Sequence, residues 1–160
     1  REIEHAKAGR GGRIRVKVNG LGDPEILVAL YEASQAGVEI DLIVRGICAL
    51  CPHVPGLSER IRVVCIVGRF LEHSRIYHFG NAGNDEYYIG SADWRTRNLR
   101  RRVEVAIPVL DPRCQRRLDE ILEMQINDPH AWELRADESY ERRNGPGAGS
   151  QDALVKALEK

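Results

Sequence analysis

The segment 13–44 most constrains the fold, because its hydrophobic pattern changes from a period of two residues to a helical period and back. Residues 13–19, RIRVKVN, alternate and predict a strand with one apolar face. Its core-facing side chains are Ile14, Val16 and Val18, and Arg13, Arg15, Lys17 and Asn19 point the other way. A helix capped by Asp23 and ended by Gly37 follows, and then an apolar strand over 38–44. Strand–helix–strand is the unit of an α/β layer, so we expect an α/β fold.

The rest of the chain extends this layer. Further strands are predicted over 61–68, 73–79, 86–91 and 102–109. Asp111 and Pro112 open a helix to about residue 126, with an apolar stripe of Cys114, Leu118, Ile121 and Leu122. We expect one α/β domain over residues 1–130, with a mixed sheet flanked by helices and the strands 38–44 and 61–67 at its centre. An extension over 131–160 would hold a Gly/Pro linker at 144–150 and a short helix.

Charge and cysteine content exclude some classes of protein. Lys plus Arg equals Asp plus Glu at 24 each, so net charge does not indicate a nucleic-acid partner. We expect no transmembrane segment, because no apolar run is long enough. Four cysteines do not demand a disulfide framework, which favours a reducing, cytoplasmic location. The charged, helix-like opening without Met looks like a piece cut from inside a longer protein.

A cluster of polar residues is predicted where the strands end. In the strand predicted over 73–79, His73 and Arg75 share one face. Arg45 follows the buried strand 38–44, and Ser91 follows the strand 86–91. Ligands of α/β sheets gather at the carboxyl ends of strands, so we expect Arg45, His73 and Ser91 to converge on one pocket. The competing interpretation is that His73 and Arg75 only satisfy neighbouring carboxylates.

These residue types suit phosphate chemistry. Guanidinium groups match phosphate oxygens two at a time, and small polar loops hold oxyanions with backbone N–H groups. A neutral imidazole can attack phosphorus, whereas a protonated one can give a proton to a leaving oxygen or pair with a phosphate. The sequence leaves both roles of His73 open. The basic run 95–102, RTRNLRRR, would form either a solvated face or an electropositive rim to the same site.

The Cys48-x-x-Cys51 spacing raises the question of a metal or redox site. His53 lies two residues further on, but no second ligand pair has zinc-finger spacing. We expect both thiols to be reduced and the chain to hold no metal of its own.

Several segments together resemble one family. They are KVNGLGDPEILVALYEASQAGVEIDLIVRGIC, VPGLSE, IVGRFLEHSRIYHFGN, YIGSADW, RN and RRVEV. Over about residues 2–126 the chain resembles the C-terminal, fourth domain of class 1 polyphosphate kinase, which is phospholipase-D-like. The phospholipase D pattern is His-x-Lys followed by Gly-Ser-x-Asn. Here the corresponding residues are His73-Ser74-Arg75 and Gly90-Ser91-Ala92-Asp93.

The resemblance implies reversible transfer of the terminal phosphate of ATP to inorganic polyphosphate, with Mg²⁺ bound outside this domain. It implies that the histidine that becomes phosphorylated lies in the preceding domain. His73 matches the family's second site histidine, and Arg45 matches an arginine that binds nucleotide phosphate. This domain would then supply half of an active site, binding ATP, ADP or polyphosphate through Arg45, His73, Arg75 and Ser91.

The expected partners are therefore other domains of the same polypeptide, in a full-length enzyme that forms a homo-oligomer and binds no nucleic acid. Membrane association is left open. The isolated domain would be inactive. Two alternatives remain at this point: a dimeric phospholipase-D-like phosphodiesterase or nuclease, and a non-catalytic polyanion-binding module.

Overall fold

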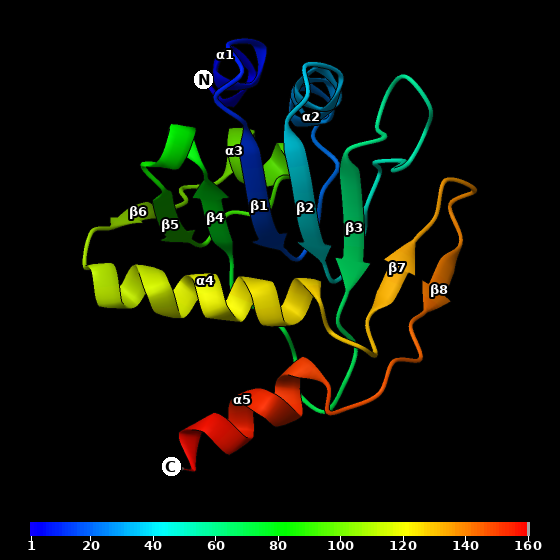
Figure 1. The fold of residues 1–160 in the computed structure, drawn as a ribbon, viewed down its shortest axis with the longest axis vertical. Coiled ribbons are helices and arrows are strands. Elements are labelled where there is room, and N and C mark those ends of the chain that lie inside the picture. Colours follow the sequence, from blue (N-terminus) through cyan, green and yellow to red (C-terminus); the bar gives the residue numbers. More distant parts are fainter. Residues whose placement is uncertain (160) are drawn as a thin grey trace.

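The computed structural model describes residues 1–159, and its strands join into a single eight-stranded sheet (Figure 1). In chain order the elements are α1 (Glu2–Lys7), β1 (Arg13–Val18), α2 (Pro24–Gln35), β2 (Glu39–Val44), β3 (Ile61–Cys65), β4 (Ile76–Phe79), the 3₁₀ turn η1 (Asn81–Gly83), β5 (Glu86–Gly90), α3 (Thr96–Arg101), β6 (Ala106–Val109), α4 (Pro112–Ile126), β7 (Trp132–Leu134), β8 (Tyr140–Arg142) and α5 (Ser150–Leu158). No helix among these residues is both long and apolar enough to cross a membrane.

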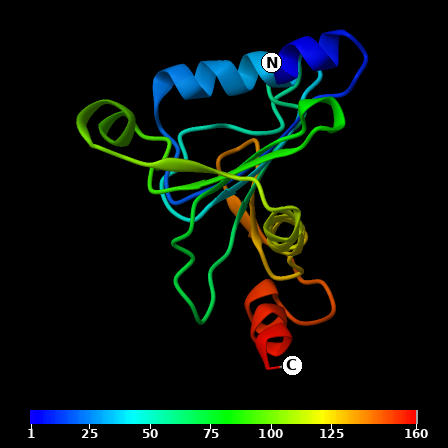
Figure 2. The same cartoon turned by 90° about the vertical axis from the view of Figure 1, so that its left-hand side faces the viewer.

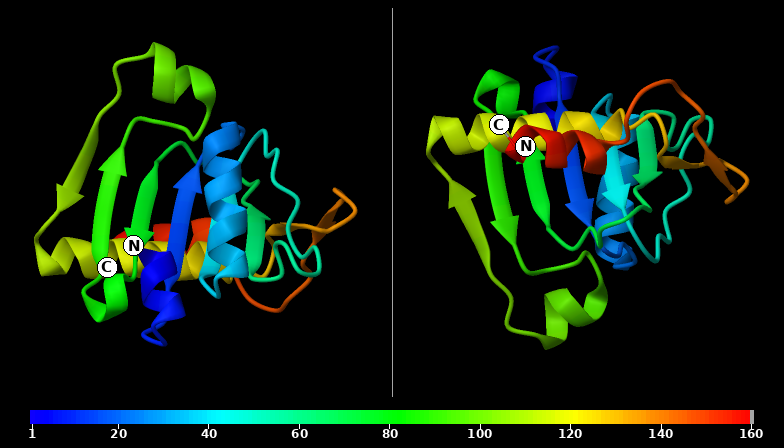
Figure 3. Two further views of the ribbon diagram at one scale, coloured as in Figure 1. Left: turned by 90° about the horizontal axis from the view of Figure 1, so that it is seen from above. Right: turned by 90° about the horizontal axis from the view of Figure 1, so that it is seen from below.

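The sheet is mixed, as predicted. Its strand order is β6-β5-β4-β1-β2-β3-β7-β8, with β1, β2 and β3 parallel and every other pair antiparallel. Strands β2 and β3 each have neighbours on both sides, in agreement with their apolar sequences. Figure 3 shows β6 at one end of the sheet and the β7–β8 hairpin at the other. The α/β fold class predicted from the sequence is confirmed.

Helices cover both faces of the sheet. Helices α1 and α2 lie on one face, whereas α4 and α5 lie on the side of the other (Figure 2). The α2 side encloses one buried apolar cluster that includes Val16 and Leu42, and the α4 side encloses a second around Leu122 and Ile126. Burying a side chain such as Leu122, which is 0% exposed, stabilises the fold by about 1.5–3 kcal/mol.

The polar face of β1 is buried rather than solvated. Arg15 and Lys17 each have only 3% of the side chain exposed. Arg15 donates a 2.9 Å hydrogen bond to Glu123 and pairs with Asp119, both on α4. Helix α4 therefore adds a layer of ion pairs to its apolar contacts, and it fixes the position of β1 relative to the helix.

Several predicted boundaries are corrected by the structure. Asp23 and Asp111 cap α2 and α4 as expected, and Gly37 follows α2 with φ +96. Cys114 is exposed, so it does not belong to the buried stripe of α4. The predicted strand 102–109 is strand only from Ala106, because Glu104 turns back to bind Ser91 and Asn98.

Three elements were not predicted. Residues 96–101 of the basic run form α3, and β7 and β8 extend the sheet beyond β3. The extension after residue 130, for which we expect a Gly/Pro linker and a short helix, also supplies these two strands to the sheet. The expected terminal helix is present as α5.

A pocket at the carboxyl edge of the sheet

One pocket lies where β1, β2 and β5 end and β4 begins. It has a volume of about 600 Å³, and we call it the carboxyl-edge pocket. Its lining residues are Asn19, Gly20, Arg45, Gly46, Ile47, His73, Arg75, Ser91, Asp93, Arg95, Arg97, Asn98, Arg102 and Glu104. The structure thus brings together Arg45, His73, Arg75 and Ser91, the four residues singled out from the sequence.

The segment that carries His73 is irregular, which corrects the strand predicted over 73–79. Strand β4 begins only at Ile76. The His73 carbonyl accepts hydrogen bonds from side chains, at 2.8 Å from Nη1 of Arg75 and 3.4 Å from Nδ2 of Asn19. His73 and Arg75 therefore meet through local hydrogen bonds rather than through a shared strand face, and the imidazole is exposed to the pocket.

The Asp93 carboxylate ties three segments together. Its Oδ1 accepts hydrogen bonds from the Asn19 backbone N–H at 2.7 Å and from Asn19 Nδ2 at 3.1 Å. Arg75 donates to Oδ1 from Nε at 3.2 Å and to Oδ2 from Nη2 at 3.3 Å. Burial raises the pKa of Asp93, but the hydrogen bonds from Arg75 and Asn19 outweigh burial and leave the pKa below its usual value. The carboxylate therefore stays ionised and links the end of β1, the start of β4 and the loop after β5.

Arg45 is oriented by the same network but keeps most of its donors free. Its Nε donates a 2.9 Å hydrogen bond to Oδ1 of Asn19. A Cβ at Gly46 would lie 2.8 Å from the Asn19 carbonyl oxygen, so glycine allows this close approach. Within residues 1–159 no carboxylate forms an ion pair with Arg45. Its two Nη groups are left to bind an anion that enters the pocket.

Ser91 is already hydrogen-bonded inside the pocket. Its hydroxyl donates to Glu104 and accepts from the Val105 backbone N–H at 3.0 Å. Asn98 Nδ2 donates to the other Glu104 oxygen at 2.7 Å. The hydrogen bond from Ser91, followed by that from Asn98, lowers the pKa of Glu104. Ser91 therefore holds the loop around α3 in place, and its hydroxyl is not free in this arrangement.

Cations outnumber carboxylates around the pocket. Besides Arg45 and Arg75 it is lined by Arg95, Arg97 and Arg102 from the basic run, against only Asp93 and Glu104. Another arginine of the run, Arg100, instead pairs with Glu25. Most of the positive charge is uncompensated, so the pocket suits a polyanion.

Asn19, Asp93 and Glu104 were not among the site residues predicted from the sequence, although Asp93 was matched to the last position of the phospholipase D pattern. Asn19 follows β1 as Arg45 follows β2, so the rule about carboxyl ends of strands could have found it. Asp93 lies two residues from Ser91 in the GSADW segment. No comparable signal marks Glu104.

The pocket offers a poor set of ligands for a divalent metal. Mg²⁺ takes oxygen ligands, and both carboxylates here already accept hydrogen bonds from protein donors. No group of three or more His, Cys, Asp or Glu side chains in residues 1–159 has the geometry to hold a metal. Cys48 and Cys51 are free thiols, and burial raises the pKa of Cys48.

Comparison with known proteins agrees with the family resemblance. The family model described as polyphosphate kinase C-terminal domain 2 matches residues 1–153, further along the chain than residue 126. A polyphosphate kinase from Thermosynechococcus vestitus is 59% identical over 149 residues, which are 92% of this chain and 20% of that protein. A second, from Chlorobaculum tepidum, is 50% identical over 98% of this chain and 23% of its own length. The chain thus spans between a fifth and a quarter of the relatives it matches.

Solved structures show the same fold. The crystal structure of polyphosphate kinase from Porphyromonas gingivalis superposes with a TM-score of 0.94 at 44% identity, covering 99% of this chain and 25% of that one. The phospholipase D family member Nuc from Salmonella typhimurium has a TM-score of 0.62 at 15% identity, covering 84% of this chain and 88% of its own. The second likeness concerns the fold alone.

Proposed function

The chain belongs to the polyphosphate kinase family, as its C-terminal domain 2, and we propose that its carboxyl-edge pocket supplies one half of the phosphate-transfer site of the full-length enzyme. The substrates would be ATP or ADP and inorganic polyphosphate. The observation that carries the proposal is the set of unpaired arginines around an exposed imidazole at the carboxyl edge. The histidine that becomes phosphorylated would lie in another part of the polypeptide.

In the proposed reaction the bond between phosphorus and the β–γ bridging oxygen of ATP breaks, and ADP leaves with the bonding electrons. The phosphoryl group is first taken by the histidine of the other domain and is then transferred to a terminal oxygen of polyphosphate. This chain would form no covalent bond to phosphate, because phosphoryl transfer depends mainly on positioning and charge stabilisation. Arg45 would bind phosphate oxygens through its free Nη groups, and Arg95, Arg97 and Arg102 would attract the polyanion.

His73 would act at the leaving oxygen or as a phosphate partner. Nη1 of Arg75 lies 3.1 Å from Nδ1 of His73. The same Nη1 lies 3.4 Å from Nε2. If Arg75 donates to Nδ1, the proton of the neutral ring is on Nε2, which would then be the hydrogen-bond donor to phosphate. A doubly protonated ring would instead give its Nε2 proton to the departing oxygen of ADP.

Arg75 and Ser91 would have supporting roles. Asp93 holds Arg75, whose side chain is 12% exposed, and Glu104 accepts from the Ser91 hydroxyl. We propose that these two residues shape and charge the pocket while Arg45 and His73 contact phosphate directly. Magnesium would be held by the substrate phosphates and by other domains, since both carboxylates of this pocket already accept protein hydrogen bonds.

The alternatives are not favoured. Relatives at 50–59% identity are polyphosphate kinases, whereas the likeness to a phospholipase D family member rests on 15% identity. A purely polyanion-binding module would not need an imidazole held beside the arginines.

An assay of ATP-dependent polyphosphate synthesis tests the proposal on three samples: the isolated chain, the full-length enzyme and full-length His73→Ala. We expect no synthesis by the isolated chain, because it holds half of the site. The substitution should lower the rate by roughly 10²–10⁴-fold, the usual contribution of an acid or base. Its thermal stability should stay close to that of the unmodified enzyme, since the His73 side chain is exposed.

Robust synthesis by the isolated chain, or near-normal rates in His73→Ala, would show that these roles are wrong. Arg142→Ala serves as a control, because Arg142 lies on β8 outside the carboxyl-edge pocket and should leave the rate unchanged.

A further inference from the structure

The loop between β3 and β4 presents His73 and makes few apolar contacts of its own. It projects from the sheet toward the side of α5 (Figure 2). Val67 is 69% exposed and Leu71 is 73% exposed, so burial of these side chains does not fix the loop. An exposed loop held so loosely needs polar anchors if His73 is to keep one position.

One anchor is Gln151, on helix α5. Its Oε1 accepts a 2.8 Å hydrogen bond from the Phe70 backbone N–H, and its Nε2 donates to the Phe70 carbonyl at 2.7 Å. Gln151 is 8% exposed. A Cβ at Gly68 would lie 2.6 Å from Oε1 of Gln151, so a side chain at this position would have to displace the amide.

The same amide reaches the neighbour of His73. Nε2 of Gln151 donates a 2.8 Å hydrogen bond to Oε1 of Glu72. Oε2 of Glu72 accepts from Nε2 of Gln125 at 2.9 Å and pairs with Nζ of Lys17 at 3.1 Å. Burial raises the pKa of Glu72, but the hydrogen bond from Gln151 and the charge of Lys17 outweigh burial and leave the pKa below its usual value. The ionised carboxylate thus joins β1, α4, α5 and the loop.

These contacts hold Glu72, the residue that precedes His73 in the chain. The Asp93 network fixes the His73 carbonyl through Arg75 and Asn19. On the preceding residues, Gln151 fixes the Phe70 backbone and the Glu72 carboxylate. We propose that Gln151 is a positioning residue for His73, which makes helix α5 part of the phosphate-transfer machinery. The proposal rests on the proposed function of His73. Gln151 touches neither substrate nor the imidazole; it acts through Phe70 and Glu72.

The test measures kcat and KM for ATP in full-length Gln151→Ala, with Lys156→Ala on the exposed face of α5 as the matched control. Loss of the amide leaves the Phe70 N–H and carbonyl without their partner and lets the loop shift. We expect kcat to fall roughly 10- to 100-fold, as for a displacement of about 1 Å at a reacting group, while KM changes less than about threefold. Lys156→Ala should match the unmodified enzyme.

If Gln151→Ala does not fold, the test can use a pair of variants that exchange the amide and the carboxylate between positions 151 and 72. Gln151→Glu places a second carboxylate against Glu72 and should lower kcat at least as much. Combining it with Glu72→Gln returns one carboxylate and one amide to the cluster beside Lys17, so kcat should rise by about tenfold over Gln151→Glu.

The outcomes separate this proposal from the one on which it rests. Normal kcat in Gln151→Ala, with His73→Ala inactive, would overturn the role of Gln151 and leave the proposed function standing. A folded double variant that is no faster than Gln151→Glu would also overturn it. Activity in His73→Ala would overturn both. Gln151 would be only a structural residue if kcat, KM and the melting temperature of Gln151→Ala all fell and if Lys156→Ala reproduced these changes.

Discussion

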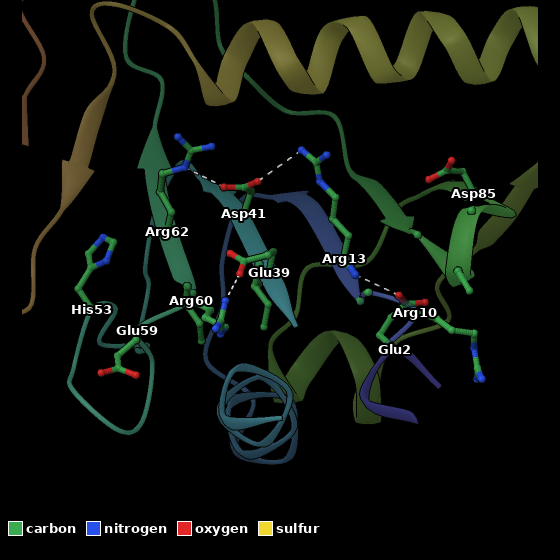
Figure 4. Close-up of a pocket in the computed structure, with 17 residues that line it drawn as sticks. Glu2, Arg10, Arg13, Glu39, Asp41, His53, Glu59, Arg60, Arg62 and Asp85 are labelled. Carbon is green, nitrogen blue, oxygen red and sulfur yellow. Dashed lines mark hydrogen bonds and ion pairs between the residues drawn. The ribbon is translucent and has the colours of Figure 1, made fainter. Parts of the chain in front are cut away.

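Two cavities of similar volume lie at opposite edges of the sheet, and they differ in how their charges are paired. The carboxyl-edge pocket has about 600 Å³ and a second cavity, the amino-edge pocket, about 570 Å³. The amino-edge pocket surrounds the starts of β1, β2 and β3 (Figure 4). Its charged lining residues, with one histidine, are Glu2, Arg10, Arg13, Glu39, Asp41, His53, Glu59, Arg60, Arg62 and Asp85.

Charge in the amino-edge pocket is neutralised within the protein. Arg62 donates to Asp41 at 2.7 Å and Arg60 pairs with Glu39, as Figure 4 shows. Four arginines there face five carboxylates, whereas five arginines face two carboxylates in the carboxyl-edge pocket. Cavity size therefore does not identify the candidate site. The surplus of unpaired guanidinium groups does, because only unpaired cations can exchange water for phosphate oxygens.

Replacing the central carboxylate of each pocket should give the largest difference between the pockets, measured as the loss of free energy of unfolding. Asp93→Asn removes the charge that holds the nearly buried Arg75, whose side chain is 12% exposed, and should lower the free energy of unfolding by about 2–4 kcal/mol. Asp41→Asn should cost about 1 kcal/mol, because its partners Arg62 and Arg13 are 35% and 48% exposed. Urea denaturation of the two variants measures both values.

The pH dependence of stability checks that the Asp93 charge is responsible. The pKa of Asp93 is lowered in the folded protein, so its contribution is present above the unfolded pKa of about 3.9 and is lost as pH falls through the folded value. Below about pH 3.9 the stability of Asp93→Asn should therefore fall less steeply than that of the unmodified chain, by up to about 1.4 kcal/mol per pH unit. The comparison of the two pockets would fail if Asp93→Asn and the unmodified chain showed the same slope of stability against pH. It would also fail if Asp93→Asn and Asp41→Asn lost the same free energy of unfolding.

Substitution of one arginine from each pocket should give the next largest difference, in ligand affinity. Arg45→Ala removes a two-point contact with phosphate and should weaken ATP binding to the full-length enzyme by about 1.5–3 kcal/mol. Arg62→Ala, matched in residue type but paired with Asp41, should change the affinity less than about twofold. Calorimetric titration measures both, and a loss for Arg62→Ala as large as that for Arg45→Ala would contradict the assignment of the two pockets.

Much of the scaffold could be predicted from local patterns. The alternation in 13–19, the caps Asp23 and Asp111, and the apolar strands 38–44 and 61–68 specify the layer and therefore the edge where Arg45 lies. The alternating pattern could not show that the polar face of β1 is buried by other parts of the chain. Arg15 and Lys17 have the sequence spacing of a solvated face, but Arg15 is covered by its ion partners on α4 and Lys17 pairs with Glu72 of the β3–β4 loop.

The site was less predictable, because its hydrogen bonds join segments far apart in the sequence. His73 and Arg75 have strand-like spacing, but β4 begins only at Ile76, and the Arg75 guanidinium and the His73 carbonyl bind Asp93 and Asn19 instead. Gln151 lies 79 residues from Glu72, and no local signal connects the two. Tertiary contacts of this kind override intrinsic strand preference.

The most direct test of the central claim, that phosphate binds at the carboxyl edge, is an NMR titration of the ¹⁵N-labelled chain with tripolyphosphate. The account predicts weak, salt-sensitive binding, with the largest shifts at the backbone N–H groups of Arg45, Gly46 and His73 and at the side chain of Asn19. Signals of Arg13, Asp41 and Arg60 should move little. Larger shifts at the amino edge than at Arg45 and His73 would contradict it.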